Sequence, residues 1–243
     1  MGYAAILQSK MLGEINAEQY KTLEKMSANS QALLTMIDQL LEATKIEAGA
    51  VEAEIHEVNL PAFLDELQSA YSVTLKKEIR VDWHYPADLP VIKTDGEKLR
   101  HILLNVVGNA IKYTKQGSVI VSARLLAETR RVEFEIADTG IGIPKEELPR
   151  IFEMFSQVKA ARARSGGGVG LGLHIVKTFT EMLGGEIRVT SEVGKGSTFT
   201  LRIPCDGERQ RAPENPNLPA VDVIESRKNK DAALTRPLPP ADS

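Results

Sequence analysis

The chain has 243 residues, with 30 basic and 33 acidic side chains and one cysteine, Cys205. This length is enough for one large domain or two small ones with a proper core. The near-balanced charge offers no basic field for nucleic acid, and a single cysteine excludes an internal disulfide framework and fits a reducing compartment. No apolar run approaches the roughly 20 residues that span a bilayer, so we expect no nucleic-acid partner and no membrane contact in this chain.

Residues 1–48 are predicted to form a helical hairpin. Apolar side chains recur at a spacing of three to four, which is typical of an amphipathic helix. This stripe consists of Leu23, Met26, Leu33, Leu34, Ile37, Leu40, Leu41 and Ile46. Residues 12–16 interrupt the hairpin with a glycine and an asparagine, and Ala48-Gly49 ends it. One hairpin has only one apolar seam to bury, so we expect it to form a bundle with a second copy; packing on its own domain is the alternative.

Residues 49–206 mix predicted strands and helices and form the second unit. The strand candidates are 119–123, 132–136, 186–190 and 198–203. The helix candidates are 61–73, 97–114 and 171–183. From residue 207 onward the apolar pattern fades while prolines and charges accumulate, so 207–243 is predicted to be a disordered tail or linker.

The stretch ADTGIGIPKEE, residues 137–147, places Asp138 at the end of a predicted strand and Gly140 and Gly142 just after it. A tight turn would explain the glycines. A pocket would explain them too, with the acid binding a ligand and the missing side chains letting that ligand approach. The DTG tripeptide also occurs in aspartic proteases, so the context has to decide.

The predicted helix 97–114 carries a polar face of Asn105, Asn109 and Lys112. At 100° per residue these side chains project within about 60° of one another. Asparagine is a poor residue for a helix interior, and amide oxygens beside an ammonium suit magnesium held mainly by substrate phosphates. A solvated polar face is the alternative. The neighbouring apolar stripe, predicted to pack on a sheet, is Leu104, Val107 and Ile111.

The stretch SGGGVGLGLHIVK, residues 165–177, places glycines before a predicted helix, where free amides and the helix dipole favour phosphate. It contains neither G-x-G-x-x-G nor the spacing of a P-loop. Upstream, Phe152 and Phe155 could pin the start of a lid whose Arg162 and Arg164 extend toward phosphates. Ordinary core residues and solvated arginines are the alternative. VGKGSTFTLRI, residues 193–203, is a turn that leads into the last predicted strand.

These patterns follow one another as N-x-x-x-N-x-x-K, D-x-G-x-G, F-x-x-F, G-G-x-G-L-G-L and G-K-G-S-T. In this order they resemble the catalytic, ATP-binding domain of sensor histidine kinases, in the superfamily shared with DNA gyrase and heat-shock chaperone ATPases. The resemblance covers residues 17–205, and the hairpin matches the dimerisation segment. It implies an α+β fold: an α/β sandwich in which helices cover a mixed sheet, the Bergerat-type ATP-binding fold, preceded by a truncated antiparallel helical hairpin.

The resemblance also implies how ATP and Mg²⁺ are bound. Asp138 would accept a hydrogen bond from the adenine amino group, which guanine cannot supply. Gly140 and Gly142 would let the base lie against the backbone. Asn109, with Asn105 beside it, would hold Mg²⁺.

Phosphate contacts and the remaining site residues are likewise implied by the resemblance. Lys112 would contact phosphate and, with Arg164, act in catalysis. The other implied ATP-binding residues are Tyr113, Gly168, Gly170, Leu171, Gly172, Leu173 and Thr198. Val169 departs from the threonine that the family often has, and His174 is interpreted as a packing residue.

Kinases of this family phosphorylate a histidine in an H-[DE]-x-[RK]-x-P box on the first hairpin helix. The four histidines of this chain are His56, His84, His101 and His174. HEVNLP, which begins at His56, has Asn59 in place of the basic residue and follows the hairpin, so we interpret it as a chance match. The opening MGYAAIL resembles the sequence just after the box. We therefore expect the chain as given not to phosphorylate itself.

The resemblance implies a two-component kinase core that transfers the ATP γ-phosphoryl group to a histidine and thence to a response-regulator aspartate. Its implied partners are a receiver domain and a second copy, bound through a hairpin weakened by truncation. Its implied location is the cytoplasm, with a parent protein that can be membrane-anchored. A serine-kinase anti-sigma factor, a kind that lacks the long leading hairpin, and a non-catalytic module that binds nucleotide and partners are the alternatives.

Overall fold

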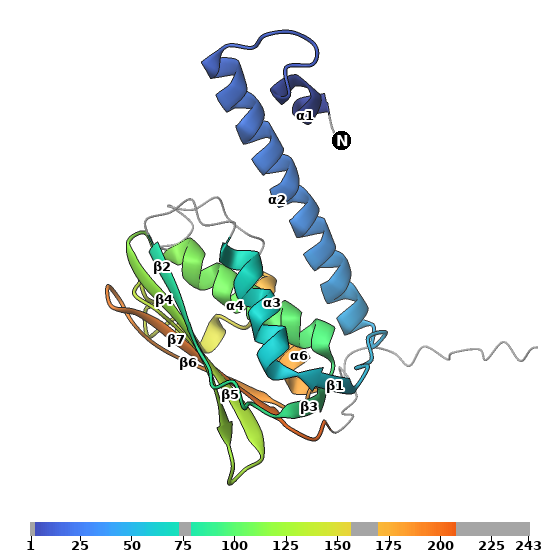
Figure 1. The fold of residues 1–243 in the computed structure, drawn as a ribbon, viewed down its shortest axis with the longest axis vertical. Coiled ribbons are helices and arrows are strands. Elements are labelled where there is room, and N and C mark those ends of the chain that lie inside the picture. The colour runs from blue at the N-terminus through green and yellow to red at the C-terminus, as the bar shows by residue number, and fades with distance from the viewer. Residues whose placement is uncertain (1–2, 73–78, 157–169, 208–243) are drawn as a thin grey trace, which may run out of the picture.

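The computed structural model describes residues 3–72, 79–156 and 170–207. Its centre is a five-stranded mixed sheet with one face covered by helices, while a long helix projects from the domain (Figure 1). The spatial order of the strands is β2 (Ile79–His84), β4 (Gly117–Leu126), β5 (Arg131–Asp138), β7 (Gly196–Pro204) and β6 (Glu186–Glu192). β2 is parallel to β4, and every other pair is antiparallel. The predicted fold class is confirmed.

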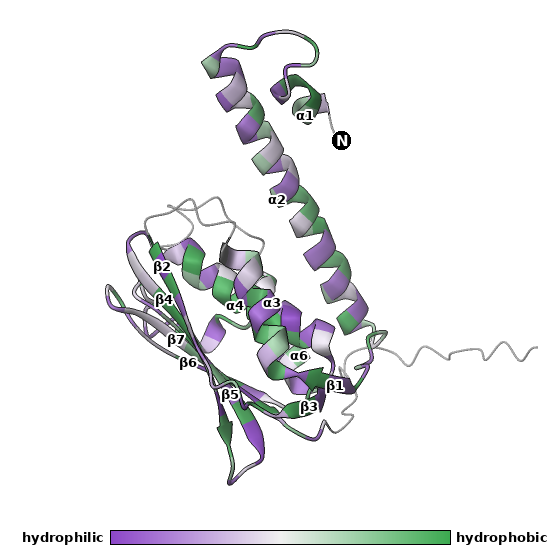
Figure 2. Ribbon diagram, viewed as in Figure 1, coloured by the Kyte–Doolittle hydropathy of each residue, from purple (hydrophilic) through white to green (hydrophobic). Residues whose placement is uncertain are grey.

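Three helices cover one face of the sheet: α3 (Leu60–Ser72), α4 (Gly96–Tyr113) and α6 (Gly172–Met182). A two-stranded antiparallel ladder pairs β1 (His56–Asn59) with β3 (Val91–Thr94) beside them, and a 3₁₀ turn, η1, spans Leu148–Arg150. Figure 2 shows apolar residues concentrated where the helices face the sheet. Alternation along β5 and β7 supplies the sheet's half of this core, namely Val132, Phe134, Ile136, Phe199, Leu201 and Ile203.

Helix α4 begins at a buried acid. Asp95 is the N-cap: its carboxylate accepts from the Lys98 amide at 3.0 Å and from the Glu54 amide at 2.9 Å, and the Lys98 ammonium lies 2.7 Å away. A capping carboxylate of this kind satisfies amides that the first turn of a helix leaves free. The cap sets where α4 begins and therefore where its polar face lies.

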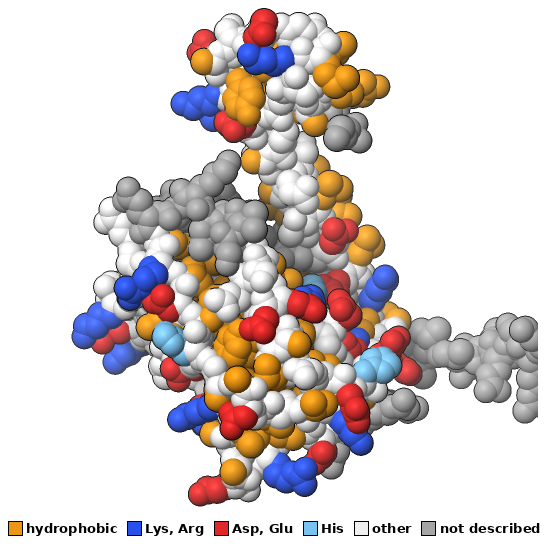
Figure 3. Space-filling model, in the orientation of Figure 1, with side chains coloured by type: hydrophobic (Ala, Val, Ile, Leu, Met, Phe, Trp, Pro, Cys, Tyr) orange, Lys and Arg blue, Asp and Glu red, His pale blue; other side chains and the backbone are white. Residues whose placement is uncertain are grey.

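The N-terminal hairpin consists of α1 (Tyr3–Gln8) and the 31-residue α2 (Ala17–Glu47). Asn16 and Gln19 form a capping box at the start of α2, with hydrogen bonds of 2.8 and 2.9 Å. Ala43 and Ile46, near its end, are buried in the domain core. The rest of the predicted stripe lies largely open, and Figure 3 shows apolar side chains along the exposed length of α2.

The structure corrects several sequence-based expectations. The break in the hairpin begins at Ser9 rather than Leu12. Strands β2 and β3 were not predicted. Leu104 is 38% exposed, so the buried stripe of α4 does not include it. That stripe is Leu99, Ile102, Leu103, Val106, Val107 and Ala110.

Most of the predicted tail lies outside the described residues, which end at Gly207. Among the described helices, none is long and apolar enough to cross a membrane.

Candidate functional site

Asp138 is the last residue of β5 and is half-buried on the helix-covered side of the sheet. Its carboxylate accepts a hydrogen bond from the Gly140 amide at 2.7 Å. Burial raises the pKa of Asp138, and hydrogen bonds from the backbone amides of Gly140 and Ser197 oppose that rise. The carboxylate is therefore partly desolvated and held by main-chain donors.

The glycines after Asp138 allow close contact between backbone segments. A Cβ on Gly140 would lie 2.7 Å from the Tyr113 carbonyl oxygen at the end of α4. Gly142 has a φ of 68°, and a Cβ there would lie 2.1 Å from the Glu192 carbonyl oxygen. Both positions need glycine for contacts within the protein, whatever a ligand also requires.

Helix α4 presents its polar face beside this loop. Asn105, Asn109 and Lys112 are all half-buried, and the Ile141 amide donates to the Tyr113 carbonyl at 3.3 Å, which ties the loop to the end of the helix. Asn105 donates from Nδ2 to the His101 carbonyl at 3.1 Å. The Lys112 ammonium lies 5.2 Å from the centre of the Tyr113 ring. Within the described part of the chain, the side-chain amide of Asn109 forms no hydrogen bond and Lys112 forms no ion pair.

The start of α6 packs against the same face of α4. A Cβ on Gly172 would lie 2.7 Å from Asn105 Oδ1, so this amide oxygen faces the first turn of α6. Gly170 has a φ of 79°, and its Cβ would lie 2.6 Å from the Ser156 carbonyl oxygen. Two motifs that are distant from α4 in sequence, the Asp138 loop and the glycines at the start of α6, therefore lie against this helix.

Several predicted site residues lie elsewhere. The Leu171 side chain is fully buried in the core, so only its backbone can contact a ligand, whereas Leu173 is half-buried. Thr198 pairs with Ala137, so it lies on the face of the sheet opposite to Asp138. Arg164 and Gly168, with Arg162 and Val169, lie outside the described residues.

Sequence reasoning missed Ser197. This residue pairs with Asp138, lies on the same face of the sheet and is 7% exposed. Counting alternate residues back from Phe199 along the predicted strand would have found it.

Phe152 and Phe155 precede α6 in the chain, and Phe152 contacts His174 on that helix. Phe152 packs partly against the core, and its carbonyl oxygen lies 3.2 Å from His174 Nδ1. Phe155 is 56% exposed with a φ of 59°, which is unusual for a residue other than glycine. The contact of His174 agrees with its interpretation as a packing residue.

Helix α2 meets the domain close to this site. Glu42 Oε1 lies 3.3 Å from His101 Nδ1, and the His101 ring packs edge-on against Phe179 at 5.4 Å. Burial raises the pKa of Glu42 and lowers the pKa of His101. Because His101 is one turn before Asn105 on α4, the end of α2 borders the polar face.

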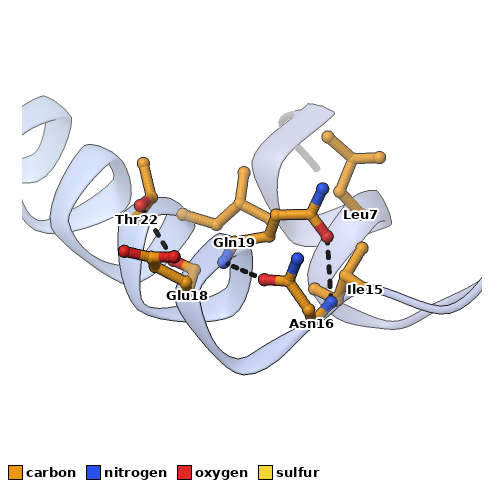
Figure 4. A pocket seen from close by; sticks show the side chains of 7 residues that line it. Leu7, Ile15, Asn16, Glu18, Gln19 and Thr22 are labelled. Atoms are coloured by element: carbon orange, nitrogen blue, oxygen red, sulfur yellow. Dashed lines mark hydrogen bonds between the residues drawn. The ribbon is translucent and has the colours of Figure 1, made fainter.

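A cavity of about 370 Å³ lies away from these motifs, between α1 and the first turns of α2 (Figure 4). It is lined by Leu7, Ile15, Asn16, Glu18, Gln19, Thr22 and Leu23. Its lining carries no residue of the motifs, so it belongs to the hairpin.

The donor set around α4 suits a magnesium ion shared with phosphates. The described residues contain no group of three or more His, Cys, Asp or Glu side chains that could hold a metal. The amide oxygens of Asn105 and Asn109 could supply only part of an octahedral shell, which phosphate oxygens and water would have to complete.

The family described as "Histidine kinase-, DNA gyrase B-, and HSP90-like ATPase" matches residues 94–207, which contain α4, the Asp138 loop, α6 and β7. Residues 94–207 belong to this ATPase family. The ATPase domain therefore includes every described residue of the convergent site.

Curated relatives of the chain are sensor kinases. Aerobic respiration control sensor protein ArcB of Escherichia coli is 35% identical over 219 residues, which are 87% of this chain and 28% of the relative. Circadian input-output histidine kinase CikA of Synechococcus elongatus is 32% identical over 96% of this chain and 32% of the relative. The chain thus spans between a quarter and a third of their lengths.

Solved structures show the same architecture. Full-length ShkA in complex with AMPPNP is 30% identical, with a TM-score of 0.67, over 86% of this chain and 44% of that one. Histidine kinase ThkA in complex with response regulator protein TrrA is 20% identical, with a TM-score of 0.62, over 84% of this chain and 58% of that one. The latter likeness concerns the fold. Residues 94–207 therefore form an ATPase domain that is similar to the ATPase domains of these sensor kinases.

Proposed function

We propose that the chain binds Mg-ATP at the convergence of α4, the Asp138 loop and the start of α6, and transfers the γ-phosphoryl group to a histidine. The observation that carries this proposal is the half-buried Asp138 carboxylate beside the polar face of α4. The complex of ShkA with AMPPNP supports a nucleotide ligand for such a domain.

Each end of the nucleotide has partners in this site. Asp138 accepts from the adenine amino group, and Ser197 replaces Thr198 as the β7 side chain on that side of the sheet. The half-buried Tyr113 flanks the base, and the backbone of Gly170, Leu171 and Gly172 approaches the phosphates at the start of α6. Lys112 contacts a phosphate as a point charge.

Asn109 and Asn105 would hold Mg²⁺, which would neutralise phosphate charge. The protein orients the γ-phosphoryl group in line with the attacking imidazole nitrogen; the new P–N bond forms as the bond to ADP breaks. A histidine phosphorylated in this way passes its phosphoryl group to a response-regulator aspartate. The complex of ThkA with a response regulator supports that partner for a kinase of this fold.

The proposed setting is a dimer in the cytoplasm. The exposed apolar side chains of α2 support pairing with a second copy of the hairpin, because such a stripe needs a partner. The single cysteine and the need for ATP support a cytoplasmic location.

Asp138→Asn tests the nucleotide site. Titration of this variant with Mg-ADP should show a binding free energy that is weaker than that of wild type by about 1–3 kcal/mol. The reason is that the carboxylate that accepts from the adenine amino group is replaced by an uncharged amide. Glu135→Gln, on the same strand but the opposite face, is the matched control and should bind normally. Unchanged affinity in Asp138→Asn would remove this residue from the base site.

Thermal unfolding at pH 7 shows whether Asp138→Asn folds. Burial raises the folded-state pKa of Asp138, so its ionised form destabilises the ligand-free fold, and stability is gained as pH falls through that pKa. The variant should therefore melt no lower than wild type at pH 7. If Asp138→Asn binds Mg-ADP more weakly but unfolds at the same temperature as wild type, the substitution acts on binding and not on folding.

A further inference from the structure

Three polar side chains lie in a row across the sheet at the proposed base site. Asp138 on β5 pairs with Ser197 on β7, and Ser197 pairs with Ser191 on β6. Cross-strand partners share a face of a sheet, so all three side chains lie on the helix-covered side. Ser197 is 7% exposed and Ser191 is half-buried, so water satisfies little of their hydrogen bonding.

The Ser191 hydroxyl uses all of its hydrogen-bonding capacity. It accepts from the Ile143 amide at 2.7 Å and donates to the Gly196 carbonyl at 2.8 Å. It also lies 2.9 Å from the Ser197 hydroxyl. A hydroxyl has one proton, and Ser191 donates its proton to the Gly196 carbonyl, which can only accept; this assigns Ser197 as the donor in the serine pair.

This direction determines what Ser197 can offer a ligand. Its only proton points at Ser191, so its remaining capacity is that of an acceptor. The Asp138 carboxylate beside it is also an acceptor, and its known partners are main-chain amides. Among these side chains, the row therefore presents acceptors alone.

We propose that Ser191 is a positioning residue that orients the Ser197 hydroxyl, so that the edge beside Asp138 selects a base with an amino group over one with a carbonyl. The inference rests on the proposed nucleotide site and adds a source of its base selectivity. A carbonyl placed there would face acceptors without a donor and would lose its hydrogen bonds with water. If Ser191 were absent, the freed Ser197 proton could serve that carbonyl, directly or through a water.

ADP and IDP are suitable probes, because their bases differ only along one edge: adenine has an amino group at C6 and a bare N1, whereas hypoxanthine has a carbonyl at C6 and a proton on N1. Titration calorimetry in magnesium buffer gives the ratio of the two dissociation constants. Wild type should favour ADP, and Ser191→Ala should narrow the ratio by about three- to tenfold, the size of one neutral hydrogen bond. Ser191→Thr, which keeps the hydroxyl, should restore it. Thr190→Ala, next in the strand and on the opposite face, should leave it unchanged.

A merely structural role would weaken ADP and IDP equally and leave the ratio as in wild type. That result in a folded Ser191→Ala protein overturns the inference. In the Ser197→Ala background, Ser191→Ala should not narrow the ratio further, and additional narrowing also counts against the inference. If Ser191→Ala does not fold, Ser191→Cys, with a similar volume and a weakly bonding thiol, decides in the same way.

Failure of the proposed function looks different. A wild-type protein that binds neither nucleotide overturns the site and this inference together. A wild-type protein that prefers ADP, combined with an unchanged ratio in the folded Ser191 variant, overturns only the inference.

Discussion

Asp138 and Asn109 are polar side chains that the protein leaves incompletely satisfied beside α4. Burial raises the pKa of Asp138, and the side-chain amide of Asn109 has no hydrogen-bond partner among the described residues. Half-buried groups of this kind contribute little to the stability of the ligand-free fold. The proposed Mg-ATP ligand would satisfy both side chains, with an amino group at Asp138 and a metal ion at Asn109.

Asn109→Ala should weaken magnesium-dependent ATP binding tenfold or more while preserving the fold, because the side chain lies on the polar face of α4. This order of magnitude corresponds to about 1.4 kcal/mol or more. ATP titrations with and without Mg²⁺ measure the dependence, and circular dichroism checks the fold. Lys115→Ala, an exposed residue just beyond α4, is the control. Equal magnesium dependence in Asn109→Ala and wild type would exclude the ligand role.

At the scale of elements, the site is held by contacts between the Asp138 loop and the β6–β7 hairpin. The Gly194 amide donates to the Ile141 carbonyl at 2.9 Å, and the Ile143 amide donates to Ser191. Gly142 and Gly196 let the two backbones approach, since a Cβ on either would clash with main-chain atoms of the other segment. The proposed base site therefore depends on contacts between these two segments, and each holds the other in place.

Gly142→Ala should destabilise the protein by about 2 kcal/mol or more, because it combines a left-handed backbone with a Cβ that has no space. Gly194→Ala separates the two causes. Gly194 has a φ of 80° but nothing within 4 Å of its Cβ position, so its variant should lose only about 1 kcal/mol. Urea unfolding measures both. Equal losses in the two variants would show that the contact between Gly142 and Glu192 contributes nothing.

At the scale of the whole molecule, α2 contacts the ATPase domain at its C-terminal end and exposes an apolar face along the rest of its length. Its last turns are part of the domain core through Ala43 and Ile46, and Glu42 contacts His101 beside the site. Residues 48–51 follow these contacts in the chain, so a rotation of the domain about this segment must break them. Met26, Leu33, Leu34, Ile37, Leu40 and Leu41 remain 45–58% exposed, which leaves a face for a second hairpin.

The chain should not phosphorylate itself, yet it should phosphorylate a separate helical hairpin that carries an intact histidine box. Without a tether the acceptor lacks an effective concentration that is often near millimolar for short linkers, so transfer should be slow and rise with acceptor concentration. Incubation with labelled ATP, with and without the hairpin, measures it. His56 begins β1 with its side chain 72% exposed, so His56→Gln is the control. Acid-labile label on the chain alone, lost in His56→Gln, would contradict the prediction.

The amino-acid sequence by itself was sufficient to predict the ATPase family, the main helices and four of the sheet strands. These predictions depend on motif order and hydrophobic period, which are read directly along the chain. It could not reveal that Gly140 and Gly142 are needed for contacts within the protein, since Tyr113 and Glu192 are distant in the chain. It also selected Thr198, whereas the pairing of β5 with β7 places Ser197 beside Asp138. Which face a side chain occupies, and what it meets there, depends on strand register and on neighbours brought together only by folding.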